Sequence, residues 1–478
     1  MGISLHIGRF CRGWPDDEDG ERWSMRHYFC DVYDGYGDLC DCDNPFVPQD
    51  TPKPVTWRED ILIIILAGSR PRYLYRLLRQ VLLQPGVSRD LVLVSLDGGY
   101  EEALRLVNVL ALNYAIHETE GVGGLSPAPR ISRHLRFALF RSIRQFPKMK
   151  KFIVLEEDLL IAPDFYSYMQ QTSEVLDQDP TVYGVSGFRH HSYTHTAYDP
   201  MRLARAHSFP AYGWMVGRSF LYETLVLWPP VEVLTDWDYW MGSGFVRRGR
   251  EIILPEIPRT VHAGVSGQHF NGLLAKRRFS NKPASKDPEQ RVNITSVLKE
   301  NYERDLHLLI KLATPLNIID PYNFTFPTKG GVYVTYIRMY SENDDKSYKI
   351  MGNALGTWSM DPRDNHHGLW VLPYYNASII IMGVPYSKYS KYRNTSIPVF
   401  NVTKELYSTM IDNYEDEDYL FQPHKLNNYL NLFHLEQEHV KDFFPLGESV
   451  PFATNNQQMS IFKMSRMGGS TLVFSNLV

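Results

Sequence analysis

Three consecutive acids, Glu156, Glu157 and Asp158, follow the apolar stretch 152–155, and apolar residues resume directly after them. Like charges this close repel one another, and burying them without a positive partner is costly. Carboxylate oxygens are the ligands that Mg²⁺ and Mn²⁺ prefer, and these ions often keep one or two protein ligands while phosphate oxygens fill the other positions. The cluster therefore predicts a metal site that holds a nucleotide diphosphate.

Two other interpretations of the acidic cluster stand beside the metal site. One is a plain strand end with solvated charges, which is the usual setting of a single acid. The other is the Walker B strand of an ATPase, which needs a G-x-x-x-x-G-K-[ST] loop that this sequence lacks. A short run of three acids fits the metal site best.

Strands and helices alternate in the part of the chain that must position these acids. Strands buried on both faces are expected at 60–68, 91–99 and 151–155, from their continuous apolar runs. Apolar spacing predicts helices at 71–82, 101–112, 132–146 and 164–176. This alternation is typical of a mostly parallel sheet with helices on both faces, so the predicted fold class is α/β.

Each of the predicted strands ends in polar residues. Arg70 follows the first strand, Asp97 ends the second, and the acidic cluster follows the third. Because ligands of open α/β sheets bind at the carboxyl ends of the strands, these side chains are expected to face one ligand.

Composition divides the 478-residue chain into four segments. They are a Cys-containing stem or linker (1–56), the α/β catalytic domain (57–320), a smaller β-rich domain with strands at 330–340 and 376–386 (321–405), and a polar, partly ordered tail (406–478).

The overall charge and hydropathy exclude several classes of protein. A net charge of −4 with no basic tract gives no indication of nucleic-acid binding. The longest strictly apolar run, Ile61–Ala67, is far too short to span a membrane, and the first residues lack the apolar core of a signal peptide. A membrane anchor is therefore expected only outside this sequence.

All four cysteines, Cys11, Cys30, Cys40 and Cys42, lie near the start of the chain. Their spacing does not match a structural zinc site, which leaves disulfides or reduced thiols, and the context favours disulfides. Five N-x-[ST] sequons are a mild excess and point to a lumenal or extracellular protein. The sequons are Asn293, Asn323, Asn376, Asn394 and Asn401.

The stretch "VLEEDLLIAPDFYSYM" resembles the metal-binding E-[DE]-D motif of glycosyltransferase family 13, the β-1,2-N-acetylglucosaminyltransferases, which have a GT-A fold. Further blocks resemble the family in the same order, over about residues 25–400. They are "YFCDVYDGYGDLCDC", "ILAGSRPRYLYRLLR", "VSLDGGYEE", "RISRHLRFAL", "YGWMVGRS", "LTDWDYWM" and "RDNHHGLW". The sequence departs from the family at "REIILPEI", where an expected cysteine is Ile, and in its last seventy or so residues.

The resemblance implies a Mn²⁺-dependent, inverting transfer of N-acetylglucosamine from UDP-GlcNAc to O2 of a mannose. It is strongest to the branch of the family that acts on O-linked mannose of glycoproteins. The alternatives are the same transfer to an N-glycan mannose, and a carbohydrate-binding pseudoenzyme of the same fold. The implied location is the Golgi lumen, where family members are type II membrane proteins.

The resemblance also implies roles for the donor-site residues. Asp158 would ligate Mn²⁺, and Glu157 would contact the ribose or a metal-bound water. Glu156 would fix the donor sugar or pair with Arg70.

Two further residues are expected at the uracil. Asp97 would accept a hydrogen bond from the ring, and His134 would lie beside it. From the sequence alone, Asp97 is equally a turn former before Gly98-Gly99, and His134 an ordinary helix residue.

Asp238 is the expected catalytic base, which takes the proton of the acceptor hydroxyl. If its segment is a strand, Asp236 faces the other way. Trp237 and Trp240 would raise the pKa of the base by desolvation, although core packing is the favoured role of Trp240.

The resemblance places two more features around the substrates. The polar, Gly-rich stretch 262–272 would close over the donor. Trp358 and Arg363, in the smaller domain, would hold the mannose acceptor.

Overall fold

The computed structural model of this chain describes residues 11, 14, 20–50, 60–118, 127–230, 236–263, 279 and 282–411. Most of the predicted closing stretch, 264–272, and most of the predicted tail, 412–478, lie outside these residues. Within the described residues, no helix has the length and apolar character that a membrane crossing requires.

In the part of the chain that the structure describes, the strands form three sheets of eight, two and four strands. The first sheet contains β1 (Ile61–Ala67), β2 (Val92–Asp97), β3 (Asn113–His117), β4 (Lys151–Glu156), β6 (Val182–Ser186), β7 (Leu203–Ala206), β8 (Trp214–Gly217) and β9 (Glu251–Pro255). The second pairs β5 (Leu159–Ile161) with β10 (Thr260–His262). The third contains β11 (Thr314–Pro315), β12 (Lys329–Met339), β13 (Leu369–Tyr374) and β14 (Asn376–Pro385).

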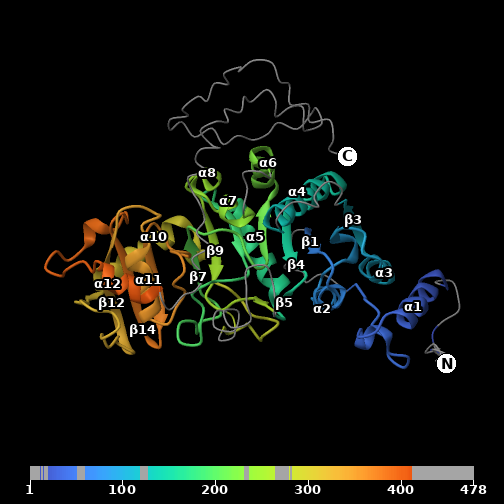
Figure 1. Ribbon diagram of the computed structural model, residues 1–478, viewed down its shortest axis with the longest axis horizontal. Helices are drawn as coiled ribbons and strands as arrows, with labels where there is room; N and C mark the ends of the chain where they lie inside the picture. Colours follow the sequence, from blue (N-terminus) through green and yellow to red (C-terminus); the bar gives the residue numbers. More distant parts are fainter. Residues whose placement is uncertain are drawn as a thin grey trace, which may run out of the picture.

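Helices connect and cover these sheets (Figure 1). The α-helices are α1 (Gly20–Val32), α2 (Pro71–Leu82), α3 (Glu101–Val109), α4 (Pro127–Gln145), α5 (Phe165–Gln178), α6 (Arg218–Leu227), α7 (Trp237–Met241), α8 (Gly244–Arg247), α10 (Lys299–Leu312), α11 (Lys346–Ala354) and α12 (Lys404–Ile411). Short 3₁₀ helices are η1 (Gly37–Cys40), η2 (Arg89–Leu91), η3 (Ile294–Val297) and η4 (Ser390–Tyr392).

The large sheet confirms the α/β prediction. Its order is β3-β2-β1-β4-β8-β6-β9-β7, and only β8 and β7 run against the other strands in the described part of the chain. Alternate residues of β1 enter two separate cores. Ile63 packs in the core that includes α2, α3 and α5, and Ile64 packs in the core that includes α4, α6 and α7. A strand buried on both faces thus explains the continuous apolar run of β1.

The topology brings the predicted ligand-binding residues to one edge. Since β1, β2, β3 and β4 are parallel neighbours, their carboxyl ends lie side by side. Arg70 caps the start of α2 directly after β1, Asp97 ends β2, and Glu156 ends β4.

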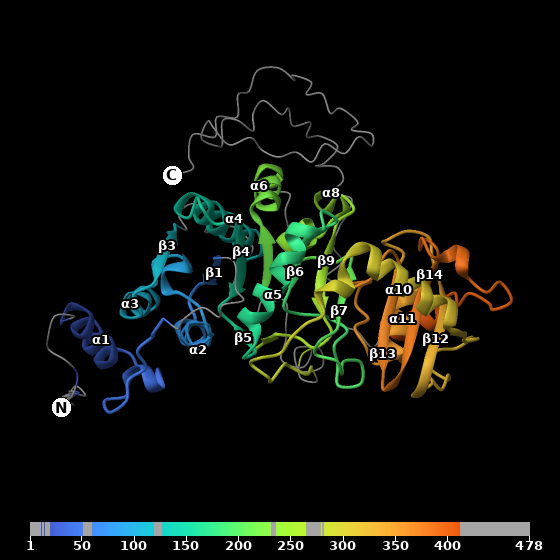
Figure 2. The same cartoon turned by 180° about the vertical axis from the view of Figure 1, so that it is seen from behind.

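The four-stranded sheet lies at the opposite end of the molecule from α1 (Figures 1 and 2). The predicted strands at 330–340 and 376–386 correspond to β12 and β14, which pair in parallel. Their sheet also includes β11, which lies before the predicted boundary at residue 320. The domain boundaries themselves remain predictions.

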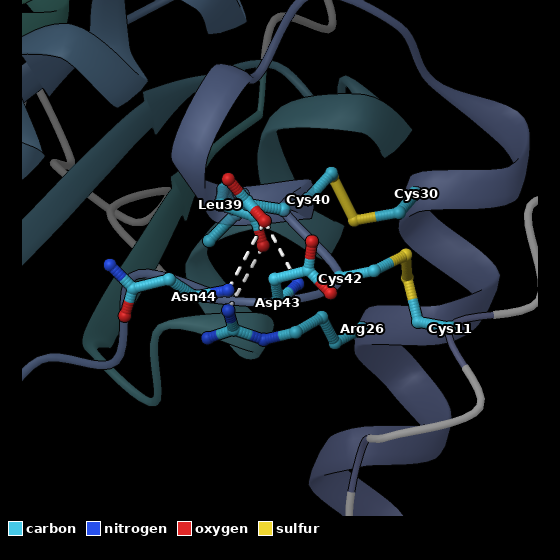
Figure 3. Close-up of a disulfide and its surroundings, with 9 residues drawn as sticks. Cys11, Arg26, Cys30, Leu39, Cys40, Cys42, Asp43 and Asn44 are labelled. Carbon is cyan, nitrogen blue, oxygen red and sulfur yellow. Dashed lines mark hydrogen bonds between the residues drawn. A yellow bond between two sulfur atoms is a disulfide. The ribbon is translucent and has the colours of Figure 1, made fainter.

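Two disulfides, Cys11–Cys42 and Cys30–Cys40, confirm the prediction for the cysteines (Figure 3). Cys30–Cys40 ties α1 to the end of η1, and Cys11–Cys42 ties the chain before α1 to the loop that follows η1. The buried guanidinium of Arg26 completes this link, because it donates hydrogen bonds to the carbonyls of Leu39 and Phe46.

Loss of the Cys30–Cys40 bridge should destabilise this N-terminal segment. Disulfides of this kind restrict the unfolded chain, so we expect Cys30→Ser with Cys40→Ser to lower the free energy of unfolding by about 2–4 kcal/mol. Urea unfolding of both proteins measures the difference, with the exposed Ser24→Ala on α1 as the control. Free labelling of the native cysteines without reductant would contradict the disulfide assignment.

Candidate active site

The acidic cluster forms the tight turn between β4 and β5, and Arg70 supplies the positive charge that it needs. The Arg70 Nε donates to Glu157 Oε1 at 2.8 Å, and its Nη2 lies 3.0 Å from Asp158 Oδ2. The backbone N–H of Gly68 donates to the other Glu157 oxygen at 2.9 Å. Arg70 thus pairs with Glu157 and Asp158 and not with Glu156, and the other expected role of Glu156, a contact with the donor sugar, stays a prediction.

Asp158 has the features of a metal ligand. It is buried, and its Oδ1 has no hydrogen-bond partner within the described residues. Its Oδ2 lies 3.5 Å from the Nε2 of His262 on β10. Burial opposes ionisation, but His262 and Arg70 hold the pKa of Asp158 below its usual value. An ionised carboxylate with an open oxygen and an imidazole beside it fit a divalent cation.

Glu156 differs from its neighbours in its charge state. Burial, together with the nearby carboxylates of Asp158 and Asp238, raises the pKa of Glu156 to about 8. The Glu156 carboxyl is therefore mostly protonated at neutral pH in the ligand-free protein. The charges of the predicted metal ligand and of the predicted base therefore both act on Glu156.

The ends of β2 and β3 form a second part of the site. Asp97 Oδ1 accepts a hydrogen bond from His117 Nδ1 at 2.8 Å, and Arg130 Nη2 lies 3.4 Å from its Oδ2. Burial acts to raise the pKa of Asp97, but the hydrogen bond from His117 outweighs this effect together with nearby positive charges, so the pKa is lowered. His134 stacks on His117 at 5.6 Å and bonds Ser95 Oγ at 2.9 Å.

His134 is an uncharged residue in this arrangement. Burial lowers the pKa of His134 to about 4, so its ring is neutral at neutral pH. The Asp97 carboxylate can accept a hydrogen bond from an uncharged heteroaromatic ring, and the flat, neutral ring of His134 can stack against such a ring.

Asp238 lies in the first turn of helix α7, and Asp236 is the N-cap residue of that helix. The strand considered for this segment is therefore wrong, because Trp237 and Trp240 follow a helical spacing into the core. The core-packing role of Trp240 is confirmed, since its side chain is fully buried. Burial raises the pKa of Asp236.

Arg363 and Trp358 lie together, next to α7. Arg363 donates to both oxygens of Asp361 at 2.7 Å and to Tyr239 Oη at 2.6 Å. Its guanidinium lies 4.8 Å from the Trp358 ring, and Trp358 Nε1 donates to Asp361 at 3.0 Å. A planar cation, an aromatic ring and a carboxylate are suited to bind a sugar with its several hydroxyls.

Tyr212 lies near the predicted metal end of the site, where its ring is 5.7 Å from that of His262. Burial raises the pKa of Tyr212 above its ordinary value, and the charges that act on it include Arg363, Asp238, Glu156 and Asp158. Tyr212 also holds a left-handed backbone angle, φ 51°, which is uncommon for a bulky residue and costs energy. Such strained positions are frequent where a side chain must be aimed at a ligand.

Several residues of the site were not predicted from the sequence. The strand-end rule would have found His117, which ends β3, had this short and partly polar strand been recognised. His262 was assigned only to the closing stretch. Tyr239 and Asp361 gave no sequence signal, because their roles arise from contacts between distant segments.

Comparison with known proteins places this geometry in a family. Residues 45–392 match the GNT-I family. Over 265 residues the chain is 28% identical to an alpha-1,3-mannosyl-glycoprotein 2-beta-N-acetylglucosaminyltransferase of Arabidopsis thaliana, which covers 53% of this chain and 58% of that protein. The chain thus aligns with little more than half of the length of this relative.

Solved structures give more distant likenesses. The mannosyltransferase PcManGT of Pyrobaculum calidifontis, in complex with GDP-Man and Mn²⁺, is 15% identical with a TM-score of 0.29, over 50% of this chain and 64% of that one. TarS of S. aureus is 11% identical with a TM-score of 0.28, over 45% of this chain and 41% of that one. These values are too low to inform the site. The sequence match over well over half of the chain is decisive, and the protein belongs to the GNT-I family, glycosyltransferase family 13.

Proposed function

We propose that this chain transfers N-acetylglucosamine from UDP-GlcNAc to O2 of a mannose, with inversion at the anomeric carbon. The observation that carries the proposal is the buried Oδ1 of Asp158, which has no hydrogen-bond partner among the described residues and lies beside Arg70 and His262 at the strand ends. The negative charges of Asp158 and Asp238 both act on Glu156, which supports a role for Asp158 at the cation and a separate role for Asp238 in proton transfer.

The chain's own residues would carry out the proton transfer and the orientation. Asp238 takes the proton of the mannose O2 hydroxyl as this oxygen forms its bond to C1 of the sugar. The bond between C1 and the phosphate oxygen breaks on the opposite face, and UDP leaves with the electron pair. Asp97 and His134 hold the uracil, and Arg70 with Glu157 shapes the rim next to the diphosphate.

A divalent cation fits this site, with Asp158 as its protein ligand and His262 within reach of a second contact. We propose Mn²⁺, which when bound neutralises charge on the departing diphosphate. The Pyrobaculum mannosyltransferase that was solved with Mn²⁺ is too distant to support this choice.

The acceptor class is proposed to be O-linked mannose on protein. The Arabidopsis relative, whose name specifies a mannosyl-glycoprotein, favours an N-glycan mannose as a second candidate. Labelled UDP-GlcNAc should be offered with an O-mannosyl peptide and with a high-mannose N-glycan in parallel reactions. Transfer to the N-glycan alone would overturn the O-mannose proposal while leaving the reaction intact.

A pseudoenzyme remains the alternative from another functional class. It would bind the sugars but release no UDP, with or without Mn²⁺. Measurable UDP release that depends on both Mn²⁺ and acceptor would exclude this alternative, and its absence at every acceptor would favour it.

We also propose the Golgi lumen as the compartment. The two disulfides suit an oxidising environment. All five sequon asparagines are exposed, so they are open to glycosylation. They are Asn293, Asn323, Asn376, Asn394 and Asn401.

Removal of the uracil contact should weaken donor binding more than catalysis. We expect Asp97→Ala to raise the KM for UDP-GlcNAc about tenfold or more, with kcat changed much less, since the contact exists equally in ground and transition states. Steady-state kinetics with varied donor measures both constants. The exposed Glu118→Ala, just beyond β3, is the control. An equal loss in kcat would place Asp97 at the chemical step instead.

A further inference from the structure

A second cluster of metal-ligating side chains lies away from the proposed active site, where the large sheet meets the four-stranded sheet. His207, Glu251 and His367 each offer a ligand atom, and these atoms all lie within 4.8 Å of one another. His207 follows β7 and Glu251 begins β9, whereas His367 lies in the turn before β13. The cluster therefore contains residues from the edges of two sheets, and these residues are far apart in the sequence.

The backbone positions these side chains on one face. β7 and β9 are antiparallel with Ala206 opposite Ile252, so continuation of this register places His207 opposite Glu251. Opposite residues of antiparallel strands carry their side chains on the same face of the sheet. From the other sheet, Asn365 forms a backbone bridge with His207, and this bridge brings the adjacent turn into contact.

His207 carries the strongest sign of a missing ligand. Both of its ring nitrogens are buried, and neither has a hydrogen-bond partner in the described part of the chain. Its ring lies 4.2 Å from that of His367. Buried ring nitrogens without partners are unfavourable, so His207 calls for a polar molecule or ion as a partner.

The backbone at His367 is also strained. His367 has φ 51° and Asp364 has φ 56°, both in the left-handed region that non-glycine residues rarely adopt. Strain of this kind persists where surrounding contacts fix a side chain in a required position.

The chemistry of the cluster suits a cation. Its two imidazoles and one carboxylate supply nitrogen and oxygen atoms of the kinds that divalent transition metals bind. Two guanidinium groups nearby are already paired, because Arg205 Nε lies 2.8 Å from Glu251 Oε2 and Arg247 Nη2 lies 2.8 Å from Glu342 Oε1.

A second ring of groups orients Glu251. Arg205 Nε lies 2.8 Å from its Oε2, and the Nδ1 of His366 bonds its Oε1. The Nε2 of His366 is in turn held by Glu303 and by Tyr389. A carboxylate has about four lone-pair sites, so these bonds leave room for an ion. Outer hydrogen bonds that fix a ligand in this way are typical of metal sites.

We propose that His207, Glu251 and His367 bind a structural Zn²⁺-class ion that fastens the four-stranded sheet to the catalytic sheet. Two imidazoles and one carboxylate form a donor set that zinc accepts, with water as the fourth ligand. Zinc bonds of about 2.0–2.1 Å place tetrahedral ligand atoms about 3.4 Å apart, so only small side-chain rotations are needed. The alternative triad of Glu303, His366 and His367 is less suitable, because both nitrogens of His366 are already bonded.

Zinc titration tests the site apart from the active-site metal. The tag-free chain carrying Asp158→Ala is stripped with EDTA and titrated with Zn²⁺ against a chromophoric chelator. We expect one Zn²⁺ to bind per chain with a dissociation constant in the micromolar range or lower, and the bound ion should raise the Tm. When Co²⁺ replaces Zn²⁺, the visible absorption bands of a tetrahedral ion should appear.

Variants identify the ligands. Loss of a residue that only orients a metal ligand typically weakens metal binding by about 10–100-fold, and this is the loss that we expect for His366→Ala. His207→Gln and His367→Gln remove ligands themselves, so each should weaken Zn²⁺ binding by more than about 100-fold. His195→Gln, whose ring bonds the Leu355 carbonyl elsewhere, should bind normally. The proposal is overturned if the chain binds no Zn²⁺, which would mean that water fills the site, or if the His207 variant binds as before. If a variant misfolds, the Co²⁺ spectrum of the chain with both histidines intact tests the proposal: tetrahedral bands support it, and their absence contradicts it.

Discussion

Asp238→Asn is expected to transfer sugar about 10²–10⁴-fold more slowly than the unmodified chain while it binds UDP-GlcNAc with Mn²⁺ almost normally. A general base acts on the acceptor hydroxyl, so its loss should spare the donor contacts proposed for Asp97 and Asp158. Asparagine keeps the size of the side chain and can still accept the hydrogen bond from the Tyr239 N–H, which is 2.8 Å long. kcat and donor affinity should be measured on the same preparation.

Asp236→Asn is the matched control, since Asp236 stands two residues away at the N-cap of α7. It should lower kcat much less, because the N-cap residue is not part of the proposed proton path. A loss below about tenfold for Asp238→Asn lies under the usual contribution of a base and would refute the assignment. Asp236 would then become the candidate base.

The parts of the fold that follow from local pattern were predictable. β1, β2 and β4 are buried on both faces and read as continuous apolar runs, and the helices between them show helical spacing. The short strands from β6 to β9 were not recognised. Each has only four or five residues, and their pairing is fixed by contacts with strands far away in the chain.

The candidate site divides in the same way. The acidic cluster, Arg70 and Asp97 could be placed at one edge, because the strand-end rule needs only the order of the strands. The partner of Arg70 could not be placed, since the choice between Glu156 and its neighbours depends on how the turn after β4 is twisted. The helical state of 237–241 was also hidden, because five residues are too few to show a period.

The cluster of His207, Glu251 and His367 shows a further limit. Its members lie 44 and 116 residues apart along the chain, by subtraction of their numbers, and no short motif contains all three. Only the register of β7 with β9 and the bridge to Asn365 bring them together. Sites built from several sheets are therefore found in a structure and missed in a sequence.

Asp158→Ala is expected to abolish Mn²⁺-dependent binding of UDP-GlcNAc, with a loss of more than about 100-fold in metal affinity. The buried Asp158 Oδ1 has no other partner among the described residues, so it is the oxygen that a cation would take. The fold should survive, because the substitution removes a charge at a turn and no core contact. Arg70 keeps its second partner, Glu157, at 2.8 Å. Calorimetric titration of UDP-GlcNAc with and without Mn²⁺ measures the effect.

The control for this variant is Asp90→Ala, an exposed aspartate before the amino end of β2, at the opposite edge of the sheet. It should bind donor and Mn²⁺ as the unmodified chain does. Retained Mn²⁺-dependent donor binding in Asp158→Ala would refute Asp158 as the metal ligand. His262 would then be the next residue to replace, because its Nε2 lies 3.5 Å from the same carboxylate and faces the same edge of the site.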